Sequence, residues 1–263
     1  MGAVLANFVG TTGAAMLLVR PLLRANSERT RTRHIFVFLI FVVCNTGGLL
    51  TPLGDPPLFL GFLQGVSFFW TLRLLPQWLL ANALILVVFW LIDTYHYRKE
   101  PPGALIADQA EYVPLRLLGG VNIVLLAGVL VAVILSGPLE HLGRLVHVPL
   151  FRDFILIALI LLSLRFGPAD PRRRNHFTWG PIGEVAIIFA GIFASMVPAL
   201  AILEARGDEL GITTPLQFFW TTGVLSSFLD NAPTYLSFTA LAQGLTGAPD
   251  AGGLMSTQVV PSL

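Results

Sequence analysis

A short polar segment interrupts an apolar stretch near the start of the chain, and this interruption limits what the chain can fold into. Residues 35–44 carry no charge, which is about 15 Å of helix and roughly half of a hydrocarbon core. Residues 45–57 then contain three glycines and three prolines, so a regular helix is not expected to continue. A half-helix, a polar break and a second half-helix over 58–70 are typical of secondary transporters, where irregular backbone lines a protein cavity.

The composition is that of a membrane protein. Hydrophobic residues make up 55% of the chain and charged residues 12%, with a mean hydropathy of +0.77, which is far from an ordinary soluble domain. The net charge is +1, and the basic residues sit in short loops, so nucleic acid is not an expected partner. The single cysteine, Cys44, excludes an intramolecular disulfide and a multi-cysteine metal site.

Uncharged runs predict the membrane segments. Residues 1–98 are expected to form the rest of a first half, 99–116 a cytoplasmic loop, and 117–263 a second half. The predicted segments are an apolar arm over 1–19, the broken helix over 35–70, spans over 74–92, 117–139, 150–166 and 182–203, and a hairpin over 215–246. Twelve lysines and arginines fall on the side of loop 24–34 and four on the other, so the positive-inside rule places that loop in the cytoplasm. The expected location is the inner (plasma) membrane.

The last apolar stretch also contains a polar break. Residues 216–229 lead to Asp-Asn-Ala-Pro at 230–233, and residues 234–245 follow. Each arm is under about 21 Å long, too short to cross a bilayer alone. A re-entrant hairpin with its tip inside the membrane is expected, and a single long span with Asp230 at mid-depth is the alternative. Two such breaks favour an inverted-repeat transporter, although the sequence shows no self-similarity.

The first break resembles a family signature. Asn-Thr-Gly-Gly at 45–48, followed by Thr-Pro-Leu-Gly-Asp-Pro-Pro at 51–57, is similar to the signature of the ion transporter superfamily. This superfamily includes D-type sodium/proton antiporters, arsenite permeases, and citrate and dicarboxylate carriers. Weaker resemblance covers Gly-Thr-Thr-Gly at 10–13 with Arg-Pro at 20–21, Glu-Val-Ala-Ile at 184–187, and the second break with Ser226 and Ser227.

The resemblance implies an architecture. Members have two inverted halves, each with one re-entrant hairpin and one broken helix, all meeting at a central site. It implies that residues 1–19 are the exit arm of the first hairpin. It also implies earlier helices and a hairpin tip before that arm, and a second broken helix after the second hairpin, which this sequence does not contain. The chain is therefore interpreted as a fragment of such a protein.

Candidate binding residues come from both breaks. Asn45 and Thr46 offer oxygens at a helix C-terminus, where the dipole favours a cation; capping the interrupted helix is the alternative. Asp55 is either a proton- or cation-binding carboxylate or a turn aspartate. Asp230 is favoured as a functional carboxylate because burying it ionised costs about 2.5–3.5 kcal/mol; capping the second arm is its alternative. The full candidate set is Asn45, Thr46, Gly47, Gly48, Thr51, Asp55, Ser226, Ser227, Asp230, Asn231 and Thr234. A sodium ion is expected at Asn45, Thr46, Asp230 and Asn231.

The sequence thus predicts an all-α polytopic secondary transporter that exchanges sodium for protons, with Asp230 and Asp55 alternating between cation and proton. No catalytic, phosphate-loop or paired-cysteine motif indicates an enzyme. No cofactor is expected beyond sodium and protons as transported or coupling ions. The alternatives are a citrate-type organic-anion carrier coupled to cations, an arsenite efflux carrier and, from another class, an inactive fragment or membrane scaffold. Expected partners are membrane lipid and a small ion or organic anion, with a homodimer left open.

Overall fold

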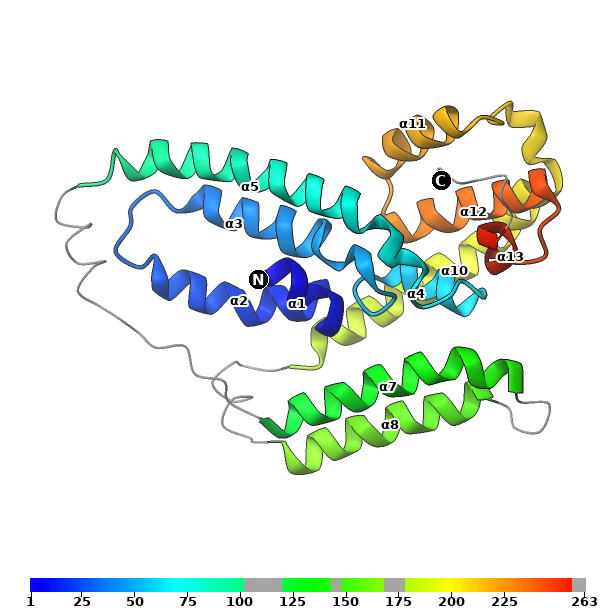
Figure 1. Cartoon of the computed structure of the whole chain (residues 1–263), viewed down its shortest axis with the longest axis horizontal. Helices are drawn as coiled ribbons and strands as arrows, with labels where there is room; N and C mark the ends of the chain where they lie inside the picture. The colour runs from blue at the N-terminus through cyan, green and yellow to red at the C-terminus, as the bar shows by residue number, and fades with distance from the viewer. Residues whose placement is uncertain (102–119, 143–147, 168–177, 257–263) are drawn as a thin grey trace. The chain divides into compact units, whose positions relative to one another are not determined.

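The computed structural model describes residues 1–101, 120–142, 148–167 and 178–256, and every regular element in these ranges is a helix (Figure 1). The all-α class expected from the sequence is confirmed. Helical stretches Arg33–Leu50, Trp70–Tyr97 and Ile182–Leu210 are long and apolar enough to cross a membrane. The chain divides into two compact units: residues 1–59 with 68–167, and residues 60–67 with 168–263.

The first unit opens with a helical hairpin. α1 (Gly2–Val9) and α2 (Thr11–Ala25) are separated by Gly10, whose φ of 77° lies in the region that favours glycine. The two arms touch closely, since a Cβ on Gly2 would lie 2.7 Å from Leu18 Cδ1 in α2. The single arm expected over 1–19 is therefore wrong, because Gly10 lets the chain turn back on itself.

The broken helix follows. α3 (Arg33–Leu39) continues as a π-helical turn, η1 (Ile40–Asn45), then a 3₁₀ turn, η2 (Gly47–Leu50). A turn over 51–55 leads to α4 (Pro56–Leu63). The expected break is confirmed, since no α-helix runs through 45–55. The second half-helix expected over 58–70 is too long, because Gly65, with a φ of 92°, follows the end of α4.

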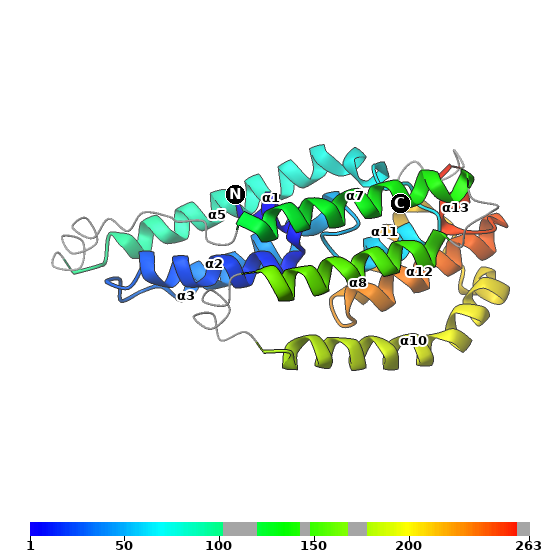
Figure 2. The ribbon, with the colours of Figure 1, turned by 90° about the horizontal axis from the view of Figure 1, so that it is seen from below.

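Three longer helices complete the described part of the first unit. After η3 (Trp70–Leu74), α5 (Leu75–Tyr97) packs along α3, and the rings of Phe38 and Phe89 lie 5.3 Å apart. α7 (Gly120–Leu142) and α8 (Val148–Phe166) lie side by side (Figures 1 and 2). The hydroxyl of Ser163 in α8 donates to Asn122 Oδ1 in α7 at 3.0 Å.

The second unit contains the second hairpin. Its elements are α10 (Gly180–Arg206), η4 (Gly207–Leu210), α11 (Pro215–Ser226), α12 (Asn231–Thr246) and α13 (Ala251–Ser256). Phe218 of α11 packs against Leu241 and Ala242 of α12, so the two helices form a hairpin with a small apolar core. α12 also approaches the end of α10 closely, since a Cβ on Gly244 would clash with the carbonyl oxygen of Glu204.

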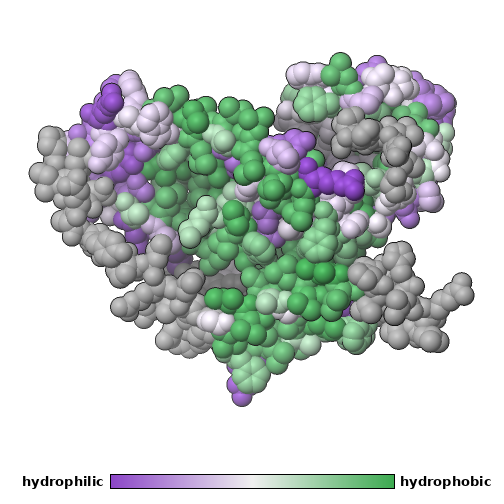
Figure 3. Space-filling model, in the orientation of Figure 1, coloured by the Kyte–Doolittle hydropathy of each residue, from purple (hydrophilic) through white to green (hydrophobic). Residues whose placement is uncertain are grey.

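Large apolar side chains cover the outside of the long helices. Trp90 on α5 is 64% exposed and Ile187 on α10 is 75% exposed. Figure 3 shows hydrophobic residues along the middle of α5 and hydrophilic ones at its C-terminal end. Contiguous apolar surface of this extent is unusual on a water-soluble monomer and is expected where lipid is the solvent. The protein is therefore a multi-pass membrane protein.

Candidate functional site

A buried asparagine of the hairpin holds the break. Asn7 in α1 is only 4% exposed. Its Nδ2 donates to the carbonyl oxygens of Gly47, at 2.8 Å, and Ala3, at 2.9 Å, while its Oδ1 accepts the N–H of Leu50 at 2.8 Å. Asn7 therefore binds both ends of η2 and satisfies polar backbone groups that the interrupted helix leaves without helical partners.

Two further hydrogen bonds join the hairpin to the break. The Thr51 hydroxyl donates to the carbonyl oxygen of Asn7 at 2.5 Å. The backbone N–H of Thr11, the first residue of α2, donates to the carbonyl oxygen of Gly54 at 3.0 Å. Together with the Asn7 amide, these contacts bind the hairpin tip to the break along its whole length, from residue 47 to residue 54.

Helix α5 covers the start of the break. Trp78 Nε1 donates to the carbonyl oxygen of Thr46 at 2.7 Å. The Thr46 hydroxyl oxygen lies 2.9 Å from Asn82 Oδ1 and 3.0 Å from the carbonyl oxygen of Phe41, and it donates its single proton to one of these two acceptors. The Asn82 Nδ2 in turn donates to the carbonyl oxygen of Trp78 at 2.9 Å. Both oxygens of Thr46 thus take part in the scaffold of the break, and a sodium-binding role for Thr46 stays a prediction.

The glycines of the break permit close backbone contact. A Cβ on Gly47 would lie 2.9 Å from the carbonyl oxygen of Val42. A Cβ on Gly48 would lie 2.6 Å from the carbonyl oxygen of Gly54 and 2.7 Å from Thr11 Cγ2. Neither position has room for a side chain. The structure therefore accounts for Gly47 and Gly48 by packing, whether or not they also bind an ion.

Helix ends of both polarities meet at the break. The Thr11–Gly54 bond brings the N-terminus of α2 next to the residues that lead into α4. Asp55, 9% exposed, precedes α4, and its carbonyl oxygen accepts the N–H of Leu58 at 3.2 Å. Helix N-termini favour negative charge, including that of Asp55, whereas the C-termini of α1 and η1 favour a cation. The break can therefore offer complementary places to an anion and a cation.

Asn45 differs from its neighbours in the break. Its side chain is exposed at the C-terminus of η1 and makes no hydrogen bond with another residue that the structure describes. Its amide oxygen is available at the end of a helix whose dipole favours a cation. Among the candidates of the first break, Asn45 therefore has the geometry most suited to a ligand.

The second break lies in the second unit, between α11 and α12. Asp230 occupies the N-cap position of α12, but its exposed side chain makes no capping hydrogen bond. The Thr234 hydroxyl donates to the carbonyl oxygen of Asp230 at 3.0 Å, and the Ser227 hydroxyl donates one turn back in α11 at 2.9 Å. Ser226 and Asn231 are exposed. Side-chain capping therefore does not explain Asp230, whereas local helix bonds explain the hydroxyls of Thr234 and Ser227.

The proposed sodium ligands come from different units. Asn45 and Thr46 belong to the first unit, and Asp230 and Asn231 to the second. A shared sodium site stays a prediction. Within the described residues, no group of three or more histidines, cysteines, aspartates or glutamates is arranged to hold a metal ion. A cation site built from these described residues would thus depend on amide, hydroxyl and backbone oxygens, with at most two carboxylates.

Sequence reasoning missed the residues that hold the break. Asn7, Trp78 and Asn82 lie in apolar helices, and Thr71 donates its hydroxyl to the carbonyl oxygen of Leu50 at 2.9 Å. All four side chains are buried. The available signal was the two isolated asparagines, because an amide inside an uncharged membrane segment needs partners.

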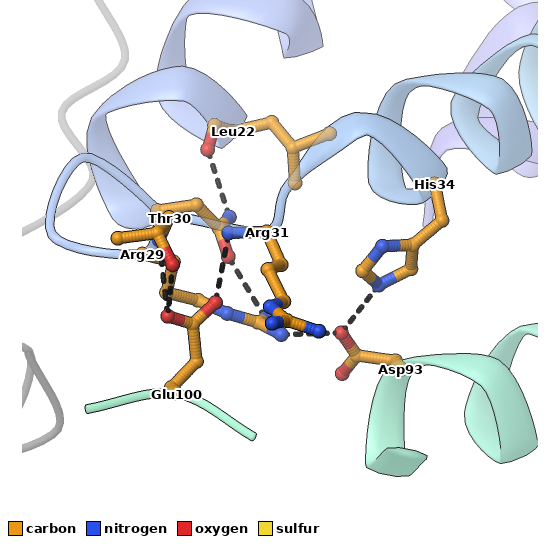
Figure 4. Close-up of polar contacts among 8 residues, drawn as sticks. Leu22, Arg29, Thr30, Arg31, His34, Asp93 and Glu100 are labelled. Carbon is orange, nitrogen blue, oxygen red and sulfur yellow. Dashed lines mark hydrogen bonds and ion pairs between the residues drawn. The ribbon is translucent and has the colours of Figure 1, made fainter. Parts of the chain in front are cut away.

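A second polar cluster anchors the α2–α3 loop to the end of α5 (Figure 4). Glu100 accepts hydrogen bonds from the Thr30 hydroxyl at 2.7 Å, the Arg31 backbone N–H at 2.8 Å and the Thr30 backbone N–H at 3.1 Å. These bonds, that from the Thr30 hydroxyl foremost, hold the pKa of Glu100 below its usual value. Glu100 is therefore ionised at neutral pH and fixes the loop.

Asp93 makes the second attachment of this loop. One oxygen, Oδ1, lies 2.7 Å from Arg29 Nη2 and 2.8 Å from His34 Nε2. The Arg29 guanidinium also lies over the ring of Tyr97, 5.3 Å from its centre. The loop, the first turn of α3 and the last turns of α5 are thus connected by charge-assisted hydrogen bonds.

A family model described as "Putative citrate transport" matches residues 1–260, almost the entire chain. Neither the curated proteins nor the solved structures contain a significant match to the chain.

Proposed function

The chain belongs to this citrate-transport family, and from that premise we propose that it is a secondary active transporter that carries citrate or a related organic anion together with cations. The observation that supports the proposal most is the hydrogen-bonded contact between the α1–α2 hairpin and the broken helix. Unwound backbone and paired helix ends of this kind are how such transporters hold charged substrates.

Charge balance argues for coupling to cations. Residues 35–72, which contain the break, include no lysine or arginine, and Asp55 is their only charged residue. Helix N-termini supply only about half an elementary charge each. A citrate ion carrying two or three negative charges would therefore need bound cations for a stable complex in the membrane. Asn45 and Asp230 are the proposed ligands for sodium or for a proton-linked step.

The hydrogen bonds suggest which parts move together. The hydrogen bonds of Asn7, Thr11 and Thr51 join the hairpin to the break between residues 47 and 54, so separating the two would expose several backbone groups at once. In the proposed mechanism the hairpin and the broken helix move as one body, and access alternates by movement of this body against other helices. The expected location is the inner (plasma) membrane.

Sodium/proton exchange is the second candidate. Its support is the pair of carboxylates at the two breaks, Asp55 and Asp230, since a carboxylate can bind either a cation or a proton. In this case the anion would not be transported. Arsenite efflux has no separate support in the geometry of either break.

Proteoliposomes separate the candidates. The purified chain is reconstituted with a pH-sensitive dye inside, and uptake of radiolabelled citrate is measured with and without an inward sodium gradient. The proposal predicts citrate uptake that the gradient accelerates and unlabelled citrate competes away. Sodium-driven changes of the dye signal without citrate uptake would reject the citrate proposal in favour of exchange.

A further inference from the structure

Several basic side chains at the α2–α3 end of the first unit remain without an acidic partner. The carboxylates of Glu100 and Asp93 are used within the loop cluster, and Arg29 is paired with Asp93. Five exposed cations surround this cluster, and none forms an ion pair with another described residue: Arg24, Arg31, Arg33, Arg98 and Lys99. We call these five residues the basic platform.

The backbone that carries the platform is fixed. Arg31 and Arg33 lie in the loop and in the first turn of α3, where Glu100 binds the Arg31 N–H and Asp93 contacts His34. Arg98 follows the end of α5, and its N–H donates to the carbonyl oxygen of Thr94 at 3.1 Å. A ligand would therefore meet charges already held in place, at a reduced entropy cost.

Apolar and aromatic residues lie directly beside the platform. Leu23 directly precedes Arg24 on α2, and Leu91 lies about two turns before Arg98 on α5. Both side chains are more than half exposed. Tyr95, also exposed, lies under Lys99, whose ammonium group is 3.9 Å from the ring centre. Tyrosine and basic residues at the end of an apolar helix are typical of the level where lipid headgroups begin.

We propose that the basic platform binds the phosphate groups of anionic phospholipids, whose acyl chains lie along the exposed apolar flanks of α2 and α5. Arginine guanidinium groups match phosphate oxygens in a two-point geometry, and clustered bases beside a membrane helix attract anionic headgroups. The exposed bases adjoin apolar helix flanks that face the bilayer, so a lipid can place its headgroup at the charges and its acyl chains along the flanks, whereas a soluble anion would contact the charges alone. The partner is therefore a lipid, and it binds independently of which substrate the protein carries.

The test compares lipids of equal chain length on the purified chain in neutral detergent. Binding of dioleoylphosphatidylglycerol and dioleoylphosphatidylcholine is titrated by native mass spectrometry and by the shift in melting temperature. We expect tighter binding of phosphatidylglycerol. In Arg31→Gln/Arg33→Gln/Arg98→Gln its apparent affinity should fall by at least about tenfold. The control, Arg73→Gln/Arg165→Gln/Arg206→Gln, removes the same charge from exposed arginines elsewhere, of which Arg206 is paired with Glu209, and should keep the preference.

The proposal would be overturned if the wild-type chain bound phosphatidylglycerol no more tightly than phosphatidylcholine, or if the platform variant kept the wild-type affinity for phosphatidylglycerol. It would also be overturned if the control variant lost as much affinity as the platform variant. Equal stabilisation of the chain by soluble glycerol phosphate would overturn it too, because that result would indicate a free-anion site. If the platform variant fails to fold, the salt dependence of phosphatidylglycerol binding to the wild-type chain tests the proposal. Its preference should weaken steeply as salt rises from 0.05 to about 0.5 M, because the screening length shortens to a few ångströms. A salt-independent preference would reject an electrostatic headgroup site.

Discussion

The side-chain amide of Asn7 donates to the carbonyl oxygen of Gly47 at 2.8 Å, across 40 residues of sequence. The same side chain accepts the N–H of Leu50, so one residue of the hairpin satisfies both ends of the 3₁₀ turn in the broken helix. The break is thus an ordered segment whose backbone groups are hydrogen-bonded to another part of the protein.

Asn7→Ala should destabilise the protein and abolish transport. The substitution removes the side-chain partner of the buried Leu50 N–H and leaves the Gly47 carbonyl oxygen with the longer bond from Trp78 Nε1, at 3.2 Å. An unsatisfied buried group costs about 1–3 kcal/mol. We expect a loss of about 1–3 kcal/mol in unfolding free energy, measured as a lower melting temperature in detergent. Asn45→Ala is the control, since that exposed side chain contributes no hydrogen bond to a described residue. Equal melting temperatures for the two variants would refute this role for Asn7.

Gly48→Ala should be more damaging than an alanine at an open glycine. The new Cβ would lie 2.6 Å from the Gly54 carbonyl oxygen and 2.7 Å from Thr11 Cγ2, so the hairpin and the break would have to separate. We expect a loss of about 2 kcal/mol or more, within the range for overpacking. Gly191→Ala in α10 is the control: a Cβ there meets nothing within 4 Å, and it should be neutral or stabilising by up to about 1 kcal/mol. Melting curves of the two variants, measured under the same conditions, will show whether Gly48→Ala is more destabilising than Gly191→Ala.

Glu100→Gln should reduce stability in a pH-dependent way. Hydrogen bonds from Thr30 and Arg31 hold the folded-state pKa of Glu100 below its unfolded value of about 4.3. Ionised Glu100 therefore stabilises the fold above that unfolded value, and this stabilisation is lost as pH falls through the lower folded-state pKa. The difference in melting temperature between wild type and variant should be largest near pH 7 and shrink toward pH 3. A melting-temperature difference between wild type and Glu100→Gln that grew on acidification would contradict this prediction.

The break could be predicted from sequence because its cause is local. Gly47, Gly48 and Pro52 prevent a regular helix regardless of what surrounds them. The hairpin at Gly10 could not be located in this way, because residues 1–19, which include α1, Gly10 and the first part of α2, form one uncharged run that resembles a single membrane span. Gly65 was missed for a related reason, since a single glycine in an apolar run does not show that its φ is positive.

The partners of the break were beyond sequence reasoning for another reason. Asn7, Trp78 and Asn82 reach it from two other helices, and no periodicity in one sequence records which helices pack together. The candidate residues of the first break are expected from sequence to be free to bind an ion, whereas the hydroxyls of Thr46 and Thr51 donate hydrogen bonds to oxygens of the protein itself. The kind of oxygen atom and its depth in the membrane indicate where an ion-binding site can be. The tertiary hydrogen bonds determine which of these oxygens remain available to bind an ion.

Substituting the carboxylates of the two breaks, Asp230 and Asp55, should show which residue binds the cation and which one stabilises the fold. Asp230 is exposed and does not cap α12, so Asp230→Asn should change unfolding free energy by no more than about 0.5 kcal/mol while removing the sodium stimulation of citrate uptake. Asp55 is buried beside two helix N-termini, so Asp55→Asn should cost about 1 kcal/mol through loss of its interaction with the helix dipoles. Melting temperature and sodium-dependent uptake are measured on both variants in the same lipid. Unchanged sodium stimulation in Asp230→Asn would remove Asp230 from the cation site, because a neutral amide cannot replace a carboxylate that balances the charge of the ion.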